Sequence, residues 1–422
     1  MSCGIAPSPE KPVDRASALP LRAGPSLSPD AFYEIRRRTL LEGCKWDPQV
    51  GDTPTLAPFP LWLRGEDWLR LSRFAEQLTA ETFAAERELA EAPPELLKQL
   101  GLPSAVRRGL QQDTPLTPAA ARVVRFDFHF TTDGWRISEA NTDVPGGYSE
   151  ASFFTGAMAE FIPGAKTPGD PASVLAHALE ASADGQPIAL VAAPGYMEDQ
   201  QVVAYLAGVL RSRGCHVHVA TASQVHWREQ RAYLLSGGSL LELGALFRFY
   251  QAEWLPSLPA RCDWRKYFRG GLTPVCNPGL AITTESKRFP LIWDQLSVRP
   301  RLWSSLLPET RDPRDAPWRS DSGWLLKSAL CNTGDAVCIR ESMEPARWKS
   351  IARSVRWFPS RWIAQRRFTT VEIDTPLGPM FPCIGVFTIN GHVAGAYARL
   401  SRNLVTDFSA LDVALLIEDA PL

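Results

Sequence analysis

Residues 124–141 read VRFDFHFTTDGWRISEAN, and apolar and polar residues alternate on either side of a turn that contains Gly134. Because successive side chains of a β-strand point to opposite faces, the three phenylalanines share one face and Arg125, Asp127 and His129 share the other. Aromatic side chains in a row favour burial against a core, and the polar row favours a face that lines a polar space. The segment therefore predicts a β-hairpin near the centre of the fold.

The register of this hairpin decides whether its polar residues meet. A three-residue loop over residues 132–134, with the glycine in the left-handed conformation, aligns Asp127 with Glu139 and Arg125 with Asn141. Two carboxylates that face each other across a sheet repel, and a cation between them reverses the sign of the interaction. Two carboxylates and an amide form the all-oxygen partial shell that Mg²⁺ accepts, with water and phosphate oxygens as its other ligands.

Two alternatives to this metal site stay open. In the first, the polar face of the hairpin meets water and binds nothing. In the second, a two-residue turn at Asp133-Gly134 moves Asp127 opposite Ala140, which separates the two carboxylates and removes the reason to expect a cation.

The composition shows no overall bias of charge. Hydrophobic residues make up 45% of the 422 residues, and 45 basic residues balance 46 acidic ones, for a formal net charge of −1. This balance gives no reason to expect nucleic acid or an anionic membrane as a partner. The eight cysteines are scattered without a C-x-x-C pair, and no apolar run is long enough to span a membrane. We expect a cytoplasmic protein with reduced thiols, and the sequence does not predict its oligomeric state.

A chain of this length exceeds the size of one hydrophobic core, so several packed subdomains are expected. Helical periodicity before the hairpin and a strand–helix–strand pattern at residues 187–220 predict a mixed α+β and α/β fold. The expected parts are a Pro-rich disordered arm over residues 1–30, a helical region with the hairpin over residues 31–180, a βαβ subdomain over residues 181–275, and a C-terminal region over residues 276–422.

The hairpin also carries a family resemblance. Arg125-Phe-Asp127, Glu139-Ala-Asn141-Thr-Asp143 and Ser149-Glu150-Ala151 resemble the metal-binding stretch of the glutathionylspermidine synthetase family. The resemblance covers residues 120–160 and 270–422. Within the second range it continues through Asn277-Pro278, then Lys287-Arg288 at the start of an expected apolar helix that ends at Trp293, then Lys327, Gln365 and the closing segment from Gly385 to Arg399.

This resemblance implies a circularly permuted ATP-grasp fold. The order of the motifs agrees, because the acidic set at residues 127–141 precedes the candidate lysines Lys287 and Lys327, the reverse of the ordinary order. In such a fold, residues 181–275 would form a pre-ATP-grasp-like subdomain on the substrate side. Residues 276–422 would supply the nucleotide-binding lid and the remainder of the ATP-grasp core.

The resemblance further implies roles for individual residues. Asp127, Glu139 and Asn141 would hold the magnesium ions that bridge the phosphates of ATP. An arginine suits the reacting carboxylate or acyl phosphate, because its guanidinium grips an oxyanion with two hydrogen bonds and keeps its charge. The other implied positions are Arg125 and Arg399 as catalytic contacts, Lys287 and Lys327 at the phosphates and adenine pocket, Gln365 at the hinge that reads adenine, and Asn332 and Gly334 in a mobile loop over the phosphates.

One stretch departs from the family's pattern. In its glutathione-using enzymes, small hydroxyl or thiol residues after the acidic asparagine hold the peptide substrate. Here the run is Val144-Pro-Gly-Gly-Tyr148, which does not predict glutathione or a polyamine as substrate. We expect Val144, Gly146, Ser149 and Glu150 to contact a substrate whose chemistry the sequence does not give.

Several of these residues also have an interpretation that needs no bound ligand or metal. From the residues alone, a solvated lysine or surface arginine is the alternative for Lys287, Lys327 and Arg399. Cys215-His-Val-His218 resembles a metal cluster, but it also fits the second strand of the βαβ unit, with Cys215 and Val217 inward and both histidines outward. No G-x-S-x-G elbow is present, and the βαβ unit lacks the glycine spacing of a dinucleotide site.

Together these features predict an ATP- and Mg²⁺-dependent ligase. It would join a small carboxylate, such as an amino acid or a peptide-like acid, to an amine through an acyl phosphate, and release ADP and phosphate. Two alternatives are an ATP-binding scaffold or regulatory protein with the same fold, and a phosphotransferase that stops at the phosphorylated product.

Overall fold

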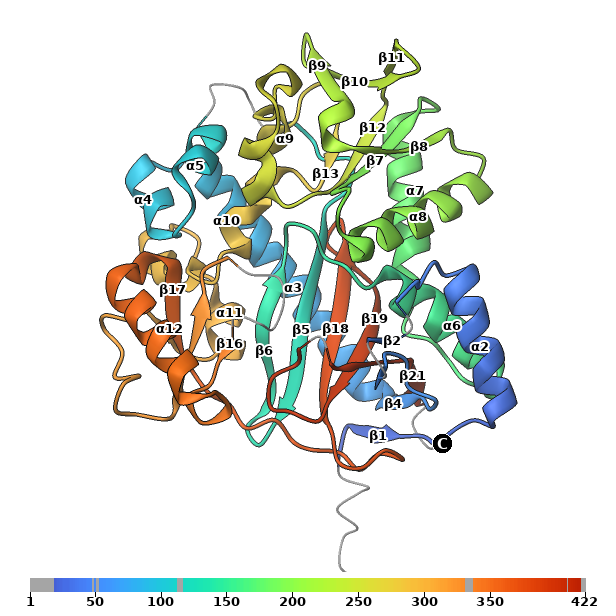
Figure 1. Ribbon diagram of the computed structural model, residues 1–422, viewed down its shortest axis with the longest axis vertical. Coiled ribbons are helices and arrows are strands. Elements are labelled where there is room, and N and C mark those ends of the chain that lie inside the picture. The colour runs from blue at the N-terminus through green and yellow to red at the C-terminus, as the bar shows by residue number, and fades with distance from the viewer. Residues whose placement is uncertain are drawn as a thin grey trace, which may run out of the picture.

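The computed structural model describes residues 19–47, 49–50, 53–111, 117–330, 337–407 and 409–418. Three β-sheets dominate it: a central antiparallel sheet, a smaller antiparallel sheet beside it, and a parallel sheet at the top of the view in Figure 1. Among the described residues, no helix is both long enough and apolar enough to cross a membrane.

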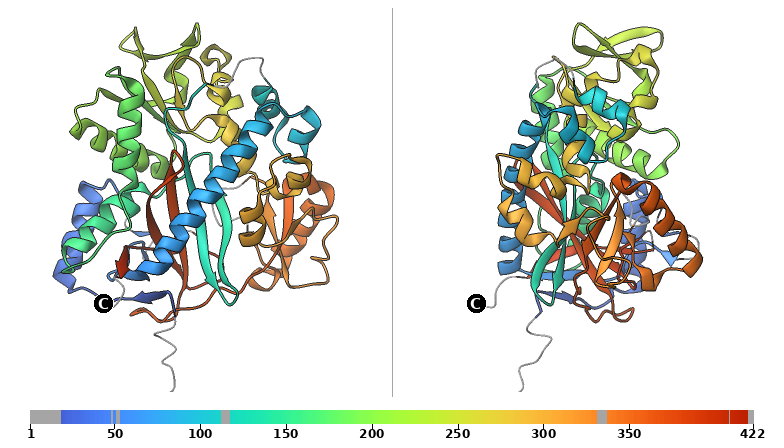
Figure 2. Two further views of the ribbon diagram at one scale, coloured as in Figure 1. Left: turned by 180° about the vertical axis from the view of Figure 1, so that it is seen from behind. Right: turned by 90° about the vertical axis from the view of Figure 1, so that its left-hand side faces the viewer.

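The central sheet has five strands in the order β20-β19-β18-β5-β6, and each is antiparallel to its neighbours. They are β5 (Val123–Thr131), β6 (Gly134–Asn141), β18 (Phe381–Ile389), β19 (His392–Ser401) and β20 (Leu411–Val413). Helix α3 (Gly65–Ala90) crosses the back of this sheet, as the left view of Figure 2 shows. Its buried residues, among them Leu71, Ala75 and Leu78, recur at helical spacing and join the same core as the phenylalanines of the hairpin.

A second antiparallel sheet has the order β14-β17-β15-β16. Its strands are β14 (Thr310–Arg311), β15 (Trp324–Ser328), β16 (Val337–Cys338) and β17 (Trp362–Arg366). Helix α12 (Pro345–Trp357) covers one face, where Val355 and Trp348 pack with Trp324 and Leu326 in a small core of their own. The other face of this sheet is therefore left to line the space toward the hairpin.

The parallel sheet has the order β13-β12-β7-β8. Its elements are β7 (Ile188–Ala192), β8 (Val217–Thr221), β12 (Ala245–Phe249) and β13 (Val275–Cys276), with helices α7 (Pro171–Ala183) and α8 (Met197–Ser212) packed on it. The predicted strand–helix–strand order is present. Cys215 and Val217 pack against the core and His216 is exposed, as predicted, whereas His218 is half-buried rather than exposed and Val219 is exposed on this edge strand.

Shorter elements connect these sheets. The small strands are β1 (Leu21–Ala23), β4 (Leu61–Arg64) and β21 (Leu415–Glu418) in one sheet, β9 (Val225–Arg228), β10 (Arg231–Ser236) and β11 (Ser239–Glu242) in another, and the pair β2 (Gln49–Val50) and β3 (Thr53–Pro54). The other helices are α2 (Pro29–Leu41), α4 (Pro94–Gln99), α5 (Ser104–Leu110), α6 (Thr155–Glu160), α9 (Lys266–Arg269), α10 (Ile282–Glu285) and α11 (Arg301–Leu306).

The predicted disordered arm over residues 1–30 is wrong for the part of it that the structure describes. Residues 1–18 lie outside the described part of the chain, but β1 already pairs with β4 in an antiparallel register. Helix α2 then starts at Pro29, because the hydroxyl of Ser28 accepts a hydrogen bond from the first turn and a proline suits the first helical position. Because the stretch is rich in proline, its sequence predicts disorder and does not indicate β1 or the start of α2.

The helix expected to start near Lys287 is also different. Only a short 3₁₀ helix, Phe289–Gln295, forms in this stretch. The backbone N–H of Lys287 instead donates to the carbonyl oxygen of Ala329 at 2.9 Å, so the residue is held beside β15 by a tertiary hydrogen bond. Lys287 is thereby fixed next to the second antiparallel sheet.

The two outer ends of the hairpin are tied together by the side chain of Asn277. Its Oδ1 accepts from the N–H of Val123 at 2.8 Å, and its Nδ2 donates to the carbonyl oxygens of Val123 and Thr142, each at 2.8 Å. Asn277 itself is buried and directly follows β13. One side chain therefore links the parallel sheet to both strands of the hairpin.

Replacement of this amide tests the link. We expect Asn277→Ala to lower the free energy of unfolding by about 3 kcal/mol, because buried backbone groups at both ends of the hairpin lose their partner. Urea unfolding followed by tryptophan fluorescence measures the change, and Asn403→Ala, at an exposed position, is the matched control. Equal stability of the two variants would contradict the role of Asn277.

Candidate active site

The hairpin brings its polar residues together by a route that differs from the prediction. Its loop has two residues, so Thr131 faces Gly134, and the predicted three-residue loop is wrong. A β-bulge at Ser138 adds one residue to β6 and restores the register beyond it. Asp127 therefore faces Glu139, and Arg125 faces Asn141, as the sequence predicts.

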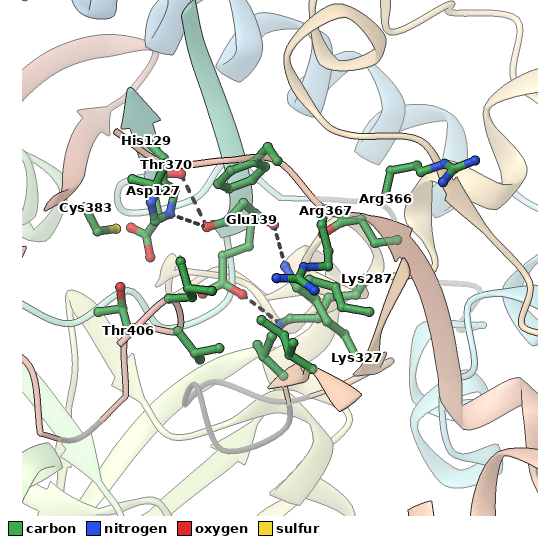
Figure 3. Close-up of a pocket in the computed structure, with 18 of the residues that line it drawn as sticks. Asp127, His129, Glu139, Lys287, Lys327, Arg366, Arg367, Thr370, Cys383 and Thr406 are labelled. Carbon is green, nitrogen blue, oxygen red and sulfur yellow. Dashed lines mark hydrogen bonds and ion pairs between the residues drawn. The ribbon is translucent and has the colours of Figure 1, made fainter. Parts of the chain in front are cut away.

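A pocket lies between the central sheet and the four-stranded sheet. Strands β5, β6, β18 and β19 form one wall, and β15, β16 and β17 form the other. The residues that the sequence singles out and that line this pocket are Asp127, Glu139, Lys287, Lys327, Gln365 and Arg399. Figure 3 shows the Glu139 side chain pointing from the hairpin toward Lys287, with Lys327 nearby.

The carboxylate of Asp127 is held by cations in this arrangement. Arg125 donates from Nε and Nη2 to its two oxygens at 2.8 and 3.0 Å, and Arg399 Nη2 lies 3.4 Å from Oδ2. The Nδ2 atom of Asn141 lies 3.4 Å from the same oxygen. Arg125 and Asn141 do not line the pocket, so they form a layer beneath Asp127 rather than part of the open surface.

Glu139 faces the two lysines. Lys287 Nζ lies 3.2 Å from its Oε2, and Lys327 Nζ donates to the carbonyl oxygen of Ser138 at 3.0 Å. Burial raises the pKa of Glu139, but the positive charges of Lys287 and Lys327 outweigh burial and hold the pKa at about 2. Burial in turn lowers the pKa of Lys327 to about 8. The pocket thus holds a fixed carboxylate and an ammonium group that loses its proton easily.

His129 and Cys383 are among the pocket residues that received no role from the sequence. His129 is buried, its Nε2 lies 3.1 Å from Ser138 Oγ, and burial lowers its pKa to about 4, so the imidazole is neutral at pH 7. Cys383 faces Arg399 across β18 and β19, and burial raises the pKa of its thiol to about 12. The alternation of β5 already placed His129 beside Asp127, whereas no local signal marks Cys383.

The residues expected to contact substrate do not line this pocket. Val144 packs against the core of the parallel sheet, and the carbonyl oxygen of Gly146 accepts a hydrogen bond from Arg125 at 2.8 Å. Ser149 is buried at the start of a π-helical turn, and its hydroxyl has no hydrogen-bond partner among the described residues. Glu150 pairs with the buried Lys45 at 2.7 Å.

Of the other residues assigned to the nucleotide, only Gln365 lies within the described part of the chain. Gln365 is buried on β17, lines the pocket and donates from Nε2 to Thr310 Oγ1 at 3.0 Å. Asn332 and Gly334, expected in a loop over the phosphates, lie outside the described residues.

The chemistry of the donor set fits a hard divalent cation in part. Asp127, Glu139 and Asn141 supply oxygen ligands only, which suits magnesium. Across the described chain, however, no three His, Cys, Asp or Glu side chains gather closely enough to hold a metal by themselves. Magnesium at this hairpin would therefore need the phosphate oxygens of a nucleotide as further ligands, which is the usual arrangement for this ion.

The family follows from a comparison over most of the chain. The family described as glutathionylspermidine synthase preATP-grasp matches residues 62–418. The chain belongs to this family. No curated protein matches the sequence.

Two solved structures are similar to this chain. The glutathione synthetase-like effector GSS30 from Globodera pallida, in its apo form, has a TM-score of 0.62 at 12% identity, over 92% of this chain and 96% of that one. At this identity the likeness shows a shared mixed α/β fold and nothing about activity. A putative gamma-glutamylcysteine synthetase from Methylobacillus flagellatus KT reaches a TM-score of 0.41 at 12% identity, over 74% of this chain and 82% of that one.

The buried position of Lys327 gives a pH test of the pocket. Competitive labelling of the ligand-free protein with an amine-reactive reagent, read by mass spectrometry, follows this lysine alone. We expect half-maximal reactivity near pH 8, since a buried ammonium group loses its proton below the ordinary lysine pKa of about 10.4. Lys287→Met should move this midpoint up, because it removes a like charge, and Glu139→Gln should move it down. An ordinary midpoint in the wild type would contradict the pocket as described.

Proposed function

We propose that the protein is an ATP- and Mg²⁺-dependent ligase that joins a carboxylate to an amine. The observation that carries the proposal is the pocket between two sheets, in which Glu139 faces Lys287 and Lys327 and Asp127 faces Arg399. Membership of a synthase family supports the same reaction class. The substrates themselves are proposed only as a small carboxylic acid and a primary or secondary amine.

The lysines suit the phosphates of a nucleotide. Lys287 and Lys327 come from different segments and both line the wall opposite the central sheet, so two positive charges converge on one space. A nucleotide triphosphate offers the negative charge that such a pair favours. The cavity in this conformation measures about 110 Å³, less than the roughly 300–1,000 Å³ of pockets that take a whole ligand. A whole nucleotide needs more room than this conformation offers, and we propose that the two sheets separate as it enters.

The carboxylates suit magnesium once a nucleotide is present. Asp127, Glu139 and Asn141 would hold the ion, which supplies neutralisation of the charge that spreads over the transferring phosphoryl group. Lys287 pairs with Glu139, and Arg125 and Arg399 pair with Asp127, while no cation is bound. The charge of the site is thus balanced in the ligand-free protein.

The two arginines suit the acid substrate. Arg399 lines the pocket, and Arg125 lies directly behind Asp127, with its guanidinium 5.5 Å from the ring centroid of Tyr397. Both keep their charge at any pH of interest, so Arg399 can hold a carboxylate or an acyl phosphate in the pocket, while Arg125 holds Asp127 in position beneath it. Positioning and charge stabilisation of this kind need no nucleophile from the protein. The raised pKa of Cys383 agrees, because a protonated thiol is a poor nucleophile.

The proposed reaction has two balanced steps. A carboxylate oxygen of the substrate attacks the γ-phosphorus of ATP, and the bond to the bridging oxygen breaks to release ADP. The nitrogen of the amine then attacks the acyl carbon, the bond from that carbon to the phosphate oxygen breaks, and the nitrogen loses a proton. The products are an amide, ADP and inorganic phosphate.

Glu139→Gln tests the acidic half of the site. We expect the turnover number to fall by about 100-fold or more, because a neutral amide binds a divalent cation more weakly than a carboxylate does, and the charge at the phosphates is then less well neutralised. Coupled release of ADP, with mass spectrometry of the amide product across a panel of acids and amines, measures it. Glu95→Gln removes an exposed carboxylate and serves as control. Near-normal turnover of Glu139→Gln would sink the proposal.

Lys327→Met tests nucleotide binding while it keeps a side chain of similar length in the buried position. We expect the dissociation constant for ATP to rise by about tenfold or more, because one charge-assisted contact to phosphate is lost. Titration calorimetry measures the affinity, and Lys349→Met on the exposed face of α12 is the control. Unchanged ATP affinity would remove Lys327 from the site.

Isotope transfer separates the ligase from its rivals. A substrate labelled with ¹⁸O in its carboxylate should deliver one ¹⁸O atom to the released phosphate, because that oxygen becomes the bridge of the acyl phosphate. A phosphotransferase would keep the label in a stable phosphorylated product, with no amide formed. A nucleotide-binding scaffold would release no ADP with any pair of substrates.

A further inference from the structure

A second cavity lies on the far side of β15 from the candidate active site. It measures about 390 Å³ and is bounded by the end of α4, the start of α5, and residues 328–330 and 360–361. In Figure 1 this is the left side of the molecule, where α4 and α5 lie above α12 and β17. Its volume falls within the range of sites that take small molecules, roughly 300–1,000 Å³. Neither the family nor the proposed reaction gives this cavity a role.

The charge of the cavity walls is one-sided. Lys98, Arg107 and Arg361 line it together with the serines Ser328 and Ser360, and no lining residue is acidic. Within the described chain, no ion pair joins any of the three cations to an aspartate or glutamate. Lys98 and Arg361 are exposed and Arg107 is half-buried, so the cavity presents three positive charges to an anion that enters from solvent.

Arg107 is the most buried of the three cations, and one of its donors has no partner among the described residues. That donor is the buried Nε atom, which is closed to solvent and does not face the open cavity, so it does not indicate a ligand there. Arg361 supplies a second guanidinium group to the same cavity. This group lies 5.0 Å from the ring centroid of Phe358. Two guanidinium groups and an ammonium group match the several oxygens of a phosphate group.

The walls are also built to hold this shape. Arg288 donates to the carbonyl oxygens of Gln99 at 2.7 Å and Trp362 at 2.8 Å and pairs with Asp312 at 2.8 Å, which clamps the end of α4 to β17. Gly101, with φ +71, packs so closely that an added Cβ would collide with the carbonyl oxygen of Ser360. The cavity is thus a fixed feature of this junction.

We propose that this cavity is a binding site for a small phosphate-bearing anion, held by Arg107, Arg361 and Lys98. The apolar side chains of Leu102, Pro103 and Leu330 complete its walls and leave room for an organic part of the ligand. The site is distinct from the nucleotide pocket, although the two are close: Lys327 lines one and Ser328 lines the other. The proposal stands on these residues and does not depend on the ligase reaction.

Pyrophosphate is the probe that tests this site, measured by titration calorimetry on the full chain at fixed ionic strength. A Lys287→Met/Lys327→Met variant removes the lysines of the nucleotide pocket, so binding that persists reports the second cavity. We expect this variant to keep one pyrophosphate site. Adding Arg107→Gln and Arg361→Gln should raise the dissociation constant for pyrophosphate at that site by roughly tenfold or more, because two charge-assisted contacts are lost.

The matched control removes the same charge elsewhere. Arg108→Gln and Arg356→Gln change exposed arginines near the cavity that do not line it, and should leave the affinity unchanged. If the Arg107 variant unfolds, Lys98→Gln alone tests the cavity from an exposed position and should weaken binding. Loss of all pyrophosphate binding in the Lys287 and Lys327 variant would overturn the proposal. So would equal affinity after the cavity and control substitutions.

Discussion

The face-to-face placement of Asp127 and Glu139 is the constraint on which the rest of the site depends. Two carboxylates on opposite residues of neighbouring strands repel, so the hairpin is stable only where each finds a positive partner. Arg125 and Arg399 neutralise the first, and Lys287 neutralises the second. These partners come from β5, β19 and the segment after α10, so the polar face of the hairpin is satisfied only when distant parts of the chain have assembled around it.

The sequence predicts much of this hairpin because the geometry of a strand allows little choice. A period of two residues places Asp127 and Glu139 on polar faces whatever the neighbours are. It does not predict the bulge, since one extra residue in a strand leaves no mark on the alternation before or after it. The predicted loop was one residue too long and Ser138 added one residue to the strand, so the two differences cancelled and the pairing was correct.

Long-range contacts explain most of what the sequence did not predict. Glu150 was expected at the substrate, but its partner is Lys45, more than 100 residues away along the chain. Lys287 was expected on a helix, but a hydrogen bond to Ala329 sets its backbone. The resemblance to a family pointed to the lysines of the pocket, whereas residues alone left each of them open. Roles on the nucleotide and the metal stay predictions, because no bound group tests them.

The pocket and the second cavity share one wall. Ser286 donates to the carbonyl oxygen of Leu100 at 2.6 Å, Lys287 lines the pocket, and Arg288 clamps the junction beside the cavity. Of these consecutive residues, Lys287 lies at the pocket and Arg288 lies beside the second cavity. On β15, Lys327 likewise lines the pocket and Ser328 lines the cavity. Separation of the two sheets around the pocket would therefore also shift residues that line the second cavity.

The most direct test of the central claim is a crystal structure with a non-hydrolysable ATP analogue and Mn²⁺, located by its anomalous scattering. The account predicts manganese at oxygen atoms of Asp127, Glu139 and Asn141, with the phosphates between the hairpin and Lys287 and Lys327. It also predicts that the two antiparallel sheets lie further apart than in the ligand-free protein. Nucleotide and metal bound elsewhere, with Glu139 still paired to Lys287, would contradict it.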